Sequence, residues 1–310
     1  MILTSWFRVS IVDVINFVFL AINIILYFFT VDRTPYSIHL FFLYLLSFAL
    51  ILFAGRLRGK KASGLLLKVV FFAYPIIFLF LIFESFFMIL PYFNSLRYDD
   101  MLIRIDYAMM GVHPTIWIER WIEPWLTDLM YGLYLFYFPM PLIILGRMLR
   151  KEKYREIEEA FFIFLACYYV AYAVYFFIPA SGPRFNLEGL QTVGLEGHFL
   201  TTLIRGLINV LEPNKLDAFP SLHSAILLIT MLIVLKHEKK MFYFFITPAI
   251  GITISLVYCR YHYVIDIIAG FLLAGISYKL SSKIHYKYGS RFTPHFGILC
   301  SNKSGDNCGG

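Results

Sequence analysis

Long apolar runs constrain this chain more than any other feature of its sequence. A helix needs about 20 apolar residues to cross the hydrocarbon core of a bilayer, and we find about eight runs of that order. They cover residues 9–30, 36–55, 66–91, 124–147, 160–179, 221–236, 241–259 and 262–281. Since the runs are too long for membrane strands, they predict an all-α, polytopic transmembrane helix bundle.

The composition supports a membrane protein and argues against other classes. Of the 310 residues, 60% are hydrophobic and 15% are charged, whereas a soluble domain has about 25% charged residues. The net charge of +7 is explained by basic cytoplasmic loops, so we expect no nucleic-acid partner. The four cysteines are scattered and lack metal-ligand spacing, so we expect no disulfide framework, no metal site and no cofactor.

The runs form one expected transmembrane domain over residues 1–282, followed by a polar and disordered cytoplasmic tail over residues 283–310. Between the third and fourth runs, residues 92–123 mix charged side chains with Ile, Met and Trp, which predicts amphipathic helices at the membrane interface. A second helical patch is expected at 198–211, on the surface of the loop between the fifth and sixth runs.

Basic residues predict the orientation of the chain. If the N-terminus is cytoplasmic, most of the 27 lysines and arginines fall on the cytoplasmic side, as the positive-inside rule requires. Both termini are then cytoplasmic. The run ends that carry Arg184, His223, Arg260 and His262 all lie on the outer face, which allows them to form one site.

The segment from Arg260 to Asp266 has the chemistry of a nucleophile. His262 and Asp266 are four residues apart at the start of an apolar run, so a helix places them on one face. A carboxylate there can accept a hydrogen bond from one imidazole nitrogen and leave the other nitrogen electron-rich.

Two further segments favour an anion. In Pro-Ser-Leu-His, the proline stands where the helix of Ser221 and His223 begins, and unpaired N–H groups at a helix start attract phosphate. Arg184 ends a stiff Pro-Ala-Ser-Gly-Pro-Arg turn, and its guanidinium suits phosphate oxygens. Lys215 precedes the helix of His223 and is a candidate for contact with a lipid headgroup. Together these groups predict phosphoryl transfer.

The order Gly-Pro-Arg, Pro-Ser-x-His and His-x-x-x-Asp-x-x-x-Gly resembles the type 2 phosphatidic acid phosphatase superfamily. The His-Tyr-x-x-Asp wording looks most like its inositol phosphorylceramide synthase and sphingomyelin synthase branch. The resemblance implies that His262 attacks phosphorus to form a phosphohistidine and that Asp266 orients it. It also implies that His223 protonates the leaving oxygen, while Arg184 and the Ser221 region hold phosphate. The three-motif core covers about residues 160–281.

The chain departs from the family pattern in two motifs. No lysine precedes Arg184 within reach, and its proline comes before it instead of after it. The third motif usually has an arginine six residues before the histidine, where this chain has Leu256. Arg260 is only two residues before His262, and we take it as a candidate phosphate ligand in this shifted place.

The sequence leaves the acceptor and two other functional classes open. Water as acceptor makes the protein a lipid phosphatase, whereas a lipid or inositol hydroxyl makes it a phosphotransferase. The lipid phosphate substrate is open among phosphatidate, polyprenyl diphosphate and phosphoinositol lipids, in what we expect to be a bacterial plasma membrane.

A transporter or channel with buried ionisable residues is one alternative. A metal-dependent hydrolase using His223, His262 and Asp266 as ligands is another. The oligomeric state is also open.

Overall fold

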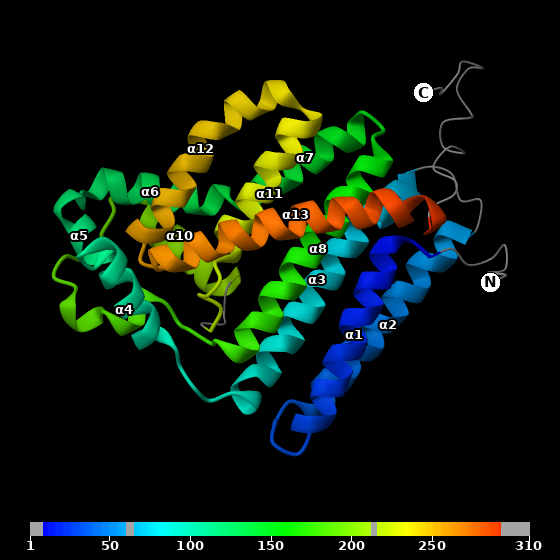
Figure 1. Cartoon of the computed structure of the whole chain (residues 1–310), viewed down its shortest axis with the longest axis horizontal. Coiled ribbons are helices and arrows are strands. Elements are labelled where there is room, and N and C mark those ends of the chain that lie inside the picture. The colour runs from blue at the N-terminus through cyan, green and yellow to red at the C-terminus, as the bar shows by residue number, and fades with distance from the viewer. Residues whose placement is uncertain (1–8, 60–64, 212–215, 293–310) are drawn as a thin grey trace. The chain divides into compact units, whose positions relative to one another are not determined.

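The computed structural model describes residues 9–59, 65–211 and 216–292. Within these ranges every regular element is a helix (Figure 1), which confirms the predicted all-α fold. Lys215 and most of the predicted tail lie outside the described residues.

Six helices in the described ranges are long and apolar enough to cross a membrane. They are α1 (Ile11–Thr30), α2 (Ser37–Gly59), α3 (Leu65–Phe93), α8 (Tyr154–Phe177), α12 (Lys239–Tyr258) and α13 (Val264–Phe292). A seventh candidate is the pair α6 (Pro124–Phe136) and α7 (Pro139–Arg150), whose axes are bent by 42°. Pro139 explains the break, because proline has no N–H and its ring clashes inside a continuous helix.

Among the eight expected spans, the sixth, at residues 221–236, differs most from the prediction. Its helix α11 (Leu222–His237) has 16 residues, or about 24 Å at 1.5 Å per residue, which is less than the thickness of the hydrocarbon core. The polar sequence from Lys236 to Lys240 separates α11 from α12, and Glu238 is both the C-cap of α11 and the N-cap of α12.

The remaining helices are short and confirm the two predicted helical regions outside the spans. The segment before α6 contains α4 (Asp99–Met110), α5 (Pro114–Trp117) and η1 (Ile118–Trp121). The long loop after α8 contains α9 (Pro183–Asn186), η2 (Glu188–Leu190) and α10 (Leu200–Leu211). Of these, α10 buries Thr201, Ile204 and Ile208 and exposes apolar side chains on its other face.

The chain divides into two compact units, and the single domain expected over residues 1–282 stays a prediction. The first comprises Met1–Tyr92, Lys151–Ala166 and Lys279–Gly310, and the second comprises Phe93–Arg150 and Cys167–Tyr278. The chain passes between the units inside α8 and α13 and at the ends of α3 and α7, so no linker in the sequence marks these boundaries. Every residue predicted for the site that the structure describes belongs to the second unit.

In the first unit, buried polar groups join helices. Arg58 of α2 forms an ion pair with Asp13 of α1, and Asn16 of α1 donates to the hydroxyl of Tyr74 at 2.9 Å. The expected polar tail begins later than predicted, because α13 continues to Phe292. His285, in this continuation, is buried with Nε2 3.4 Å from an oxygen of Glu158.

In the second unit, α6 packs against α10 and α12, and α11 packs against α12. Their shared core contains Tyr131 and Tyr134 of α6, Ile208 of α10, and Leu256 and Tyr258 of α12. The helix starts of α11 and α13 are bonded directly, since the N–H of Ser221 donates to the carbonyl of Asp266 at 3.0 Å. This packing brings helix ends from distant parts of the sequence to one place.

Candidate active site

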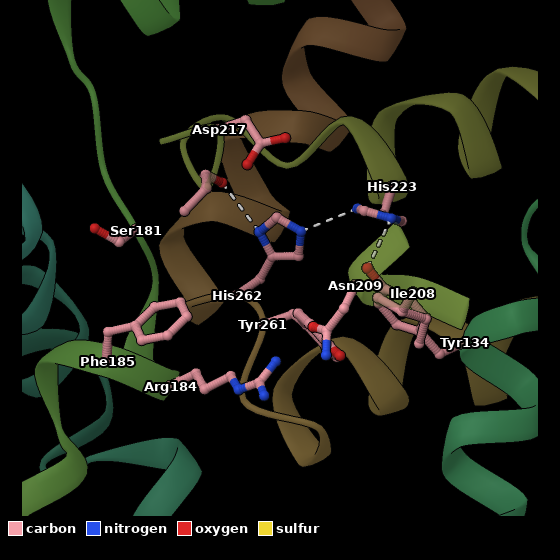
Figure 2. Close-up of a pocket in the computed structure, with 11 residues that line it drawn as sticks. Tyr134, Ser181, Arg184, Phe185, Ile208, Asn209, Asp217, His223, Tyr261 and His262 are labelled. Atoms are coloured by element: carbon pink, nitrogen blue, oxygen red, sulfur yellow. Dashed lines mark hydrogen bonds between the residues drawn. The ribbon is translucent and has the colours of Figure 1, made fainter. Parts of the chain in front are cut away.

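One pocket in the second unit collects residues from all three sequence motifs (Figure 2). It is lined by Tyr134, Ser181, Arg184, Phe185, Ile208, Asn209, Asp217, Ala218, His223, Tyr261 and His262. These residues come from α6, the turn into α9, α10, the segment before α11, α11 itself and the loop between α12 and α13. The structure therefore brings together His223, His262 and Arg184, which the sequence separates by up to 78 positions.

The two histidines are in direct contact. Nδ1 of His223 lies 3.1 Å from Nε2 of His262, and Nδ1 of His262 lies 3.0 Å from the carbonyl oxygen of Ala218. A carbonyl oxygen only accepts, so Nδ1 of His262 carries the hydrogen. In the neutral imidazole, Nε2 of His262 then has the free lone pair, as a nucleophile requires.

His223 has a second partner that the sequence did not reveal. The hydroxyl of Tyr134 lies 3.0 Å from its Nε2, as the dashed lines in Figure 2 show. Because a phenol can donate or accept, Tyr134 can pair with His223 in both protonation states. The chain has 22 tyrosines, and nothing local distinguishes this one, since α6 reaches the site only through tertiary packing.

The environment of His262 favours its neutral form. The side chain is buried, and this burial lowers the pKa of the imidazole well below its ordinary value; the neighbouring His223 lowers it further. Both effects disfavour a positive charge on the ring. His262 is thus placed as a neutral base or nucleophile near neutral pH.

Asp266 lies beside His262, as the four-residue spacing predicts. The N–H at Nδ1 of His262, however, donates to the carbonyl of Ala218 and not to Asp266. Its Oδ2 is 3.5 Å from Nδ1 of His262, whereas the carbonyl of Ala218 is closer. The same oxygen accepts a bond of 2.8 Å from the N–H of Tyr263, at the start of α13. The carboxyl group of Asp266 therefore caps the start of α13 and also faces the imidazole of His262. Asp266 is fully buried.

Arg184 enters the pocket from a turn that only glycine permits. Gly182 has a φ of +87°, and a Cβ there would lie 2.5 Å from the carbonyl oxygen of Tyr261. The N–H of Arg184 donates to the carbonyl of Arg260 at 3.0 Å. Its guanidinium carbon lies 5.8 Å from the ring centre of Tyr261. The motif turn is therefore docked on the chain segment that carries His262.

Ser221 lies behind the pocket and is not one of its lining residues. It is the N-cap of α11, where its hydroxyl accepts from the N–H of Ser224 at 3.3 Å, and it is fully buried. Its own N–H bonds to the carbonyl of Asp266. The role that we predicted for the Ser221 region in holding phosphate stays a prediction.

Arg260 also lies outside the pocket lining, and its guanidinium has other partners. Nη2 donates to Glu119 at 2.6 Å and to the carbonyl of Val193 at 2.7 Å, and Nη1 donates to Gln191 at 3.0 Å. Burial lowers the pKa of this arginine, and the Glu119 carboxylate acts in the opposite direction. The predicted contact with phosphate is untested, but this geometry favours a structural role.

Three carboxylates that we had placed in an interfacial segment hold the loops of the site. Asp99 and Asp106 of α4 and Glu119 of η1 are buried and accept hydrogen bonds from the segments that carry Arg184, Arg260 and His262. Their charges in an otherwise apolar region were visible in the sequence. Their partners were not, because these depend on how α4 docks.

Within the described residues, no group of three or more His, Cys, Asp or Glu side chains is arranged to hold a metal ion. The pocket offers instead two imidazoles, two phenols, a guanidinium and the carboxyl group of Asp217. Such a set can bind an anion, provide a nucleophile and move a proton.

Comparison with known proteins gives one match. A family model described as the PAP2 superfamily matches residues 100–280. No curated protein and no solved structure matches the chain. The match covers more than half of the chain, includes all three motifs and starts within α4. The predicted three-motif core of about residues 160–281 lies mostly within this match.

Proposed function

Because this chain belongs to the PAP2 superfamily, which comprises phosphatases and phosphotransferases, we propose that it is a membrane enzyme that transfers the phosphoryl group of a lipid phosphate through a phosphohistidine on His262. The observation that carries the proposal is the 3.1 Å contact between His223 and His262 in the pocket that Arg184 lines. A buried imidazole in contact with a half-buried one, beside a guanidinium, suits both covalent capture of phosphorus and proton transfer.

In the first step, Nε2 of His262 attacks phosphorus as the bond to the lipid oxygen breaks. The departing oxygen takes a proton from the protonated imidazole of His223. The phosphorylated ring of His262 carries a positive charge while Nδ1 keeps its hydrogen. The carbonyl of Ala218 and the carboxyl group of Asp266, at 3.0 and 3.5 Å from Nδ1, stabilise that charge.

In the second step, the acceptor oxygen attacks phosphorus and the P–N bond to His262 breaks. The acceptor proton passes to His223, which restores the starting state. Tyr134, 3.0 Å from His223, keeps the imidazole oriented in both steps because its hydroxyl can reverse its hydrogen bond. The guanidinium of Arg184 stabilises negative charge on the phosphoryl oxygens that do not react.

The surroundings of the pocket support a lipid as substrate. Ile208 and Asn209 of α10 line the pocket, and the outer face of the same helix exposes Leu203 and Val210 at 66% and 76% of their surface. An exposed apolar helix face next to an anion site suits a molecule with a phosphate head and an apolar tail. The acyl or prenyl chain would lie against α10 and neighbouring membrane lipids.

Water gives a phosphatase and a hydroxyl of a second lipid or of inositol gives a phosphotransferase, since only the acceptor differs. The His-Tyr-x-x-Asp wording, which resembles the inositol phosphorylceramide and sphingomyelin synthase branch, favours transfer. The basic loops favour an outer-face site in a bacterial plasma membrane. We propose both on these grounds.

The test is to trap the intermediate. Purified protein is incubated with phosphatidate, a polyprenyl diphosphate or a phosphoinositol lipid, each radiolabelled in the group that is transferred, and quenched in base. We expect acid-labile label on the wild type and none on His262→Ala. His113→Ala is the matched control, because His113 caps the short helix α5 outside the pocket.

Three results would contradict the proposal. Label that persists in His262→Ala would remove His262 as the nucleophile. Absence of label from every lipid, although the lipids bind, would favour the transport alternative. Turnover that is lost in EDTA and restored by a divalent metal would favour the metal-dependent hydrolase instead.

A further inference from the structure

The short helix α4 buries two carboxylates beside Leu102 and leaves several apolar side chains exposed. Asp99 and Asp106 are each 2% exposed, while Met101, Tyr107 and Met110 are 41–52% exposed. Residues seven apart on a helix lie on the same face, so both carboxylates point into the second unit. A buried carboxylate is costly unless it is hydrogen-bonded, and each of these has several donors.

Asp99 connects two parts of the candidate active site. Its Oδ1 accepts from the N–H groups of Ser181 and Gly182 at 3.0 and 2.9 Å, in the turn that leads to Arg184. The same oxygen accepts from the hydroxyl of Tyr263 at 3.1 Å. Tyr263 directly follows His262. The carboxylate of Asp99 thus holds both the turn before Arg184 and Tyr263, the residue that follows His262.

Asp106 holds the start of α13. Its two oxygens accept from the N–H groups of Val264 and Ile265 at 2.9 and 2.8 Å. With Asp266 accepting from Tyr263, the first N–H groups of α13 are paired within the protein. The start of this helix is therefore fixed by α4, immediately after His262.

We propose that Asp99 and Asp106 are positioning residues that set the place of Arg184 relative to His262. The inference rests on the proposed function, because in-line transfer requires the guanidinium and Nε2 to meet the same phosphoryl group. α4 supplies a rigid spacing of two helical turns between the two attachment points. Neither residue lines the pocket, so both act through the backbone that they hold.

The chain offers well-matched variants. Asn at either position keeps the size but replaces one acceptor oxygen with an NH₂ group that faces N–H donors. Tyr263→Phe removes only the hydroxyl that bonds to Asp99. Asp100→Asn is the control, because Asp100 lies on the same helix and is exposed. All variants are made in the full-length protein.

The first measurement is hydrogen exchange, which does not depend on activity. Asp99→Asn should speed exchange at Ser181 and Gly182, and Asp106→Asn should speed exchange at Val264 and Ile265. Asp100→Asn should change neither segment. If exchange in both segments is unchanged in the Asp99 and Asp106 variants, the positioning role is overturned even if the wild type is an active enzyme.

The second measurement is single-turnover formation of acid-labile label. We expect Asp99→Asn and Asp106→Asn to lower the rate constant by roughly 10- to 100-fold, because a small misplacement of reacting groups costs about that much. The labelled fraction of the folded protein and KM should stay near those of the wild type. Tyr263→Phe should cause a smaller decrease that does not add fully to that of Asp99→Asn.

The outcomes separate the two proposals. A smaller labelled fraction with an unchanged rate constant would mean that the carboxylates only support folding, and it would overturn the positioning role. A wild type that forms no label refutes the proposed function, while the exchange measurement still decides whether α4 holds the two loops.

Discussion

The buried imidazole of His262 is the residue on which the site depends. Its hydrogen bond to the Ala218 carbonyl fixes the tautomer, and its burial keeps the ring neutral. Sequence spacing predicted the nearness of Asp266, since i and i+4 share a helix face. It did not predict that Ala218 would take the hydrogen bond, because that carbonyl precedes a different helix.

The pH dependence of label formation should reflect this environment. A neutral nucleophile is lost as the pH falls through its pKa, and the pKa of His262 is lowered from the ordinary value of about 6.5. We therefore expect the acid limb of the single-turnover rate to lie below pH 6.5. An acid limb at or above that value would mean that His262 is not held neutral by burial.

Arg260 was predicted as a phosphate ligand, whereas the structure shows it in a buried ion pair. A cation two residues before His262 suggested a phosphate ligand, yet its guanidinium is joined to Glu119, with both side chains less than 8% exposed. Removing one partner of a buried ion pair leaves an uncompensated charge, which costs about 3–5 kcal/mol.

We therefore expect Arg260→Met and Glu119→Gln each to lower thermal stability markedly. The double variant should recover most of the loss, because no charge then remains unpaired. Thermal unfolding in detergent checks both statements. A single Arg260→Met variant with unchanged stability and a raised KM would instead support direct contact with phosphate.

Among the elements, the contact of α11 with α13 determines whether the two histidines meet. Gly270 is the last residue of the His-x-x-x-Asp-x-x-x-Gly motif. A Cβ at this position would lie 2.1 Å from Oγ of Ser224 and 2.3 Å from the carbonyl oxygen of Ser221. The glycine permits the close approach of the helix that follows His262 to the helix that begins with His223.

Gly270→Ala should push α13 away from α11 and lower the labelling rate by roughly 100-fold, as expected for a displacement of about 1 Å. Gly275→Ala is the matched control, because it lies on the same helix and nothing lies within 4 Å of its added Cβ. Comparing single-turnover rates of the two variants tests the contact. Equal rates would show that the close approach is not needed.

The elements also show which boundaries the sequence predicts well. Four of the six long spans, α1, α2, α3 and α12, were predicted within four residues at both ends, because apolar length specifies them locally. The bend between α6 and α7 was missed, although Pro139 was visible, since a proline can kink a span or end it. The extension of α13 was missed because its polar face is covered by tertiary packing at His285.

At the scale of the whole molecule, the orientation in the membrane stays a prediction from the basic loops. Gly189 of η2 and Lys239 of α12 are both exposed. The predicted topology places Gly189 on the outer side of the membrane and Lys239 on the cytoplasmic side. Single cysteines at these positions, with Cys300 and Cys308 replaced by serine, report the sidedness. The two other native cysteines are buried.

A membrane-impermeant maleimide should label Gly189→Cys in intact cells and Lys239→Cys only after permeabilisation. This result would place the pocket on the outer face, because Gly189 belongs to the same loop as Arg184. If only the Lys239→Cys protein is labelled in intact cells, the orientation is the reverse of the predicted one, and the pocket lies on the cytoplasmic side.

The sequence by itself determined the helical class, most of the spans and which side chains are candidates for the site. These predictions rest on local patterns: apolar runs, a proline at a helix start, and a histidine four residues before an aspartate. Local backbone geometry is enough to decide which structure each pattern predicts. Only the tertiary structure decided which groups meet: Ala218 and Tyr134 at the imidazoles, Glu119 at Arg260, and α4 behind the loops. Those contacts join residues 44 to 164 positions apart, and no local pattern specifies a partner at that distance.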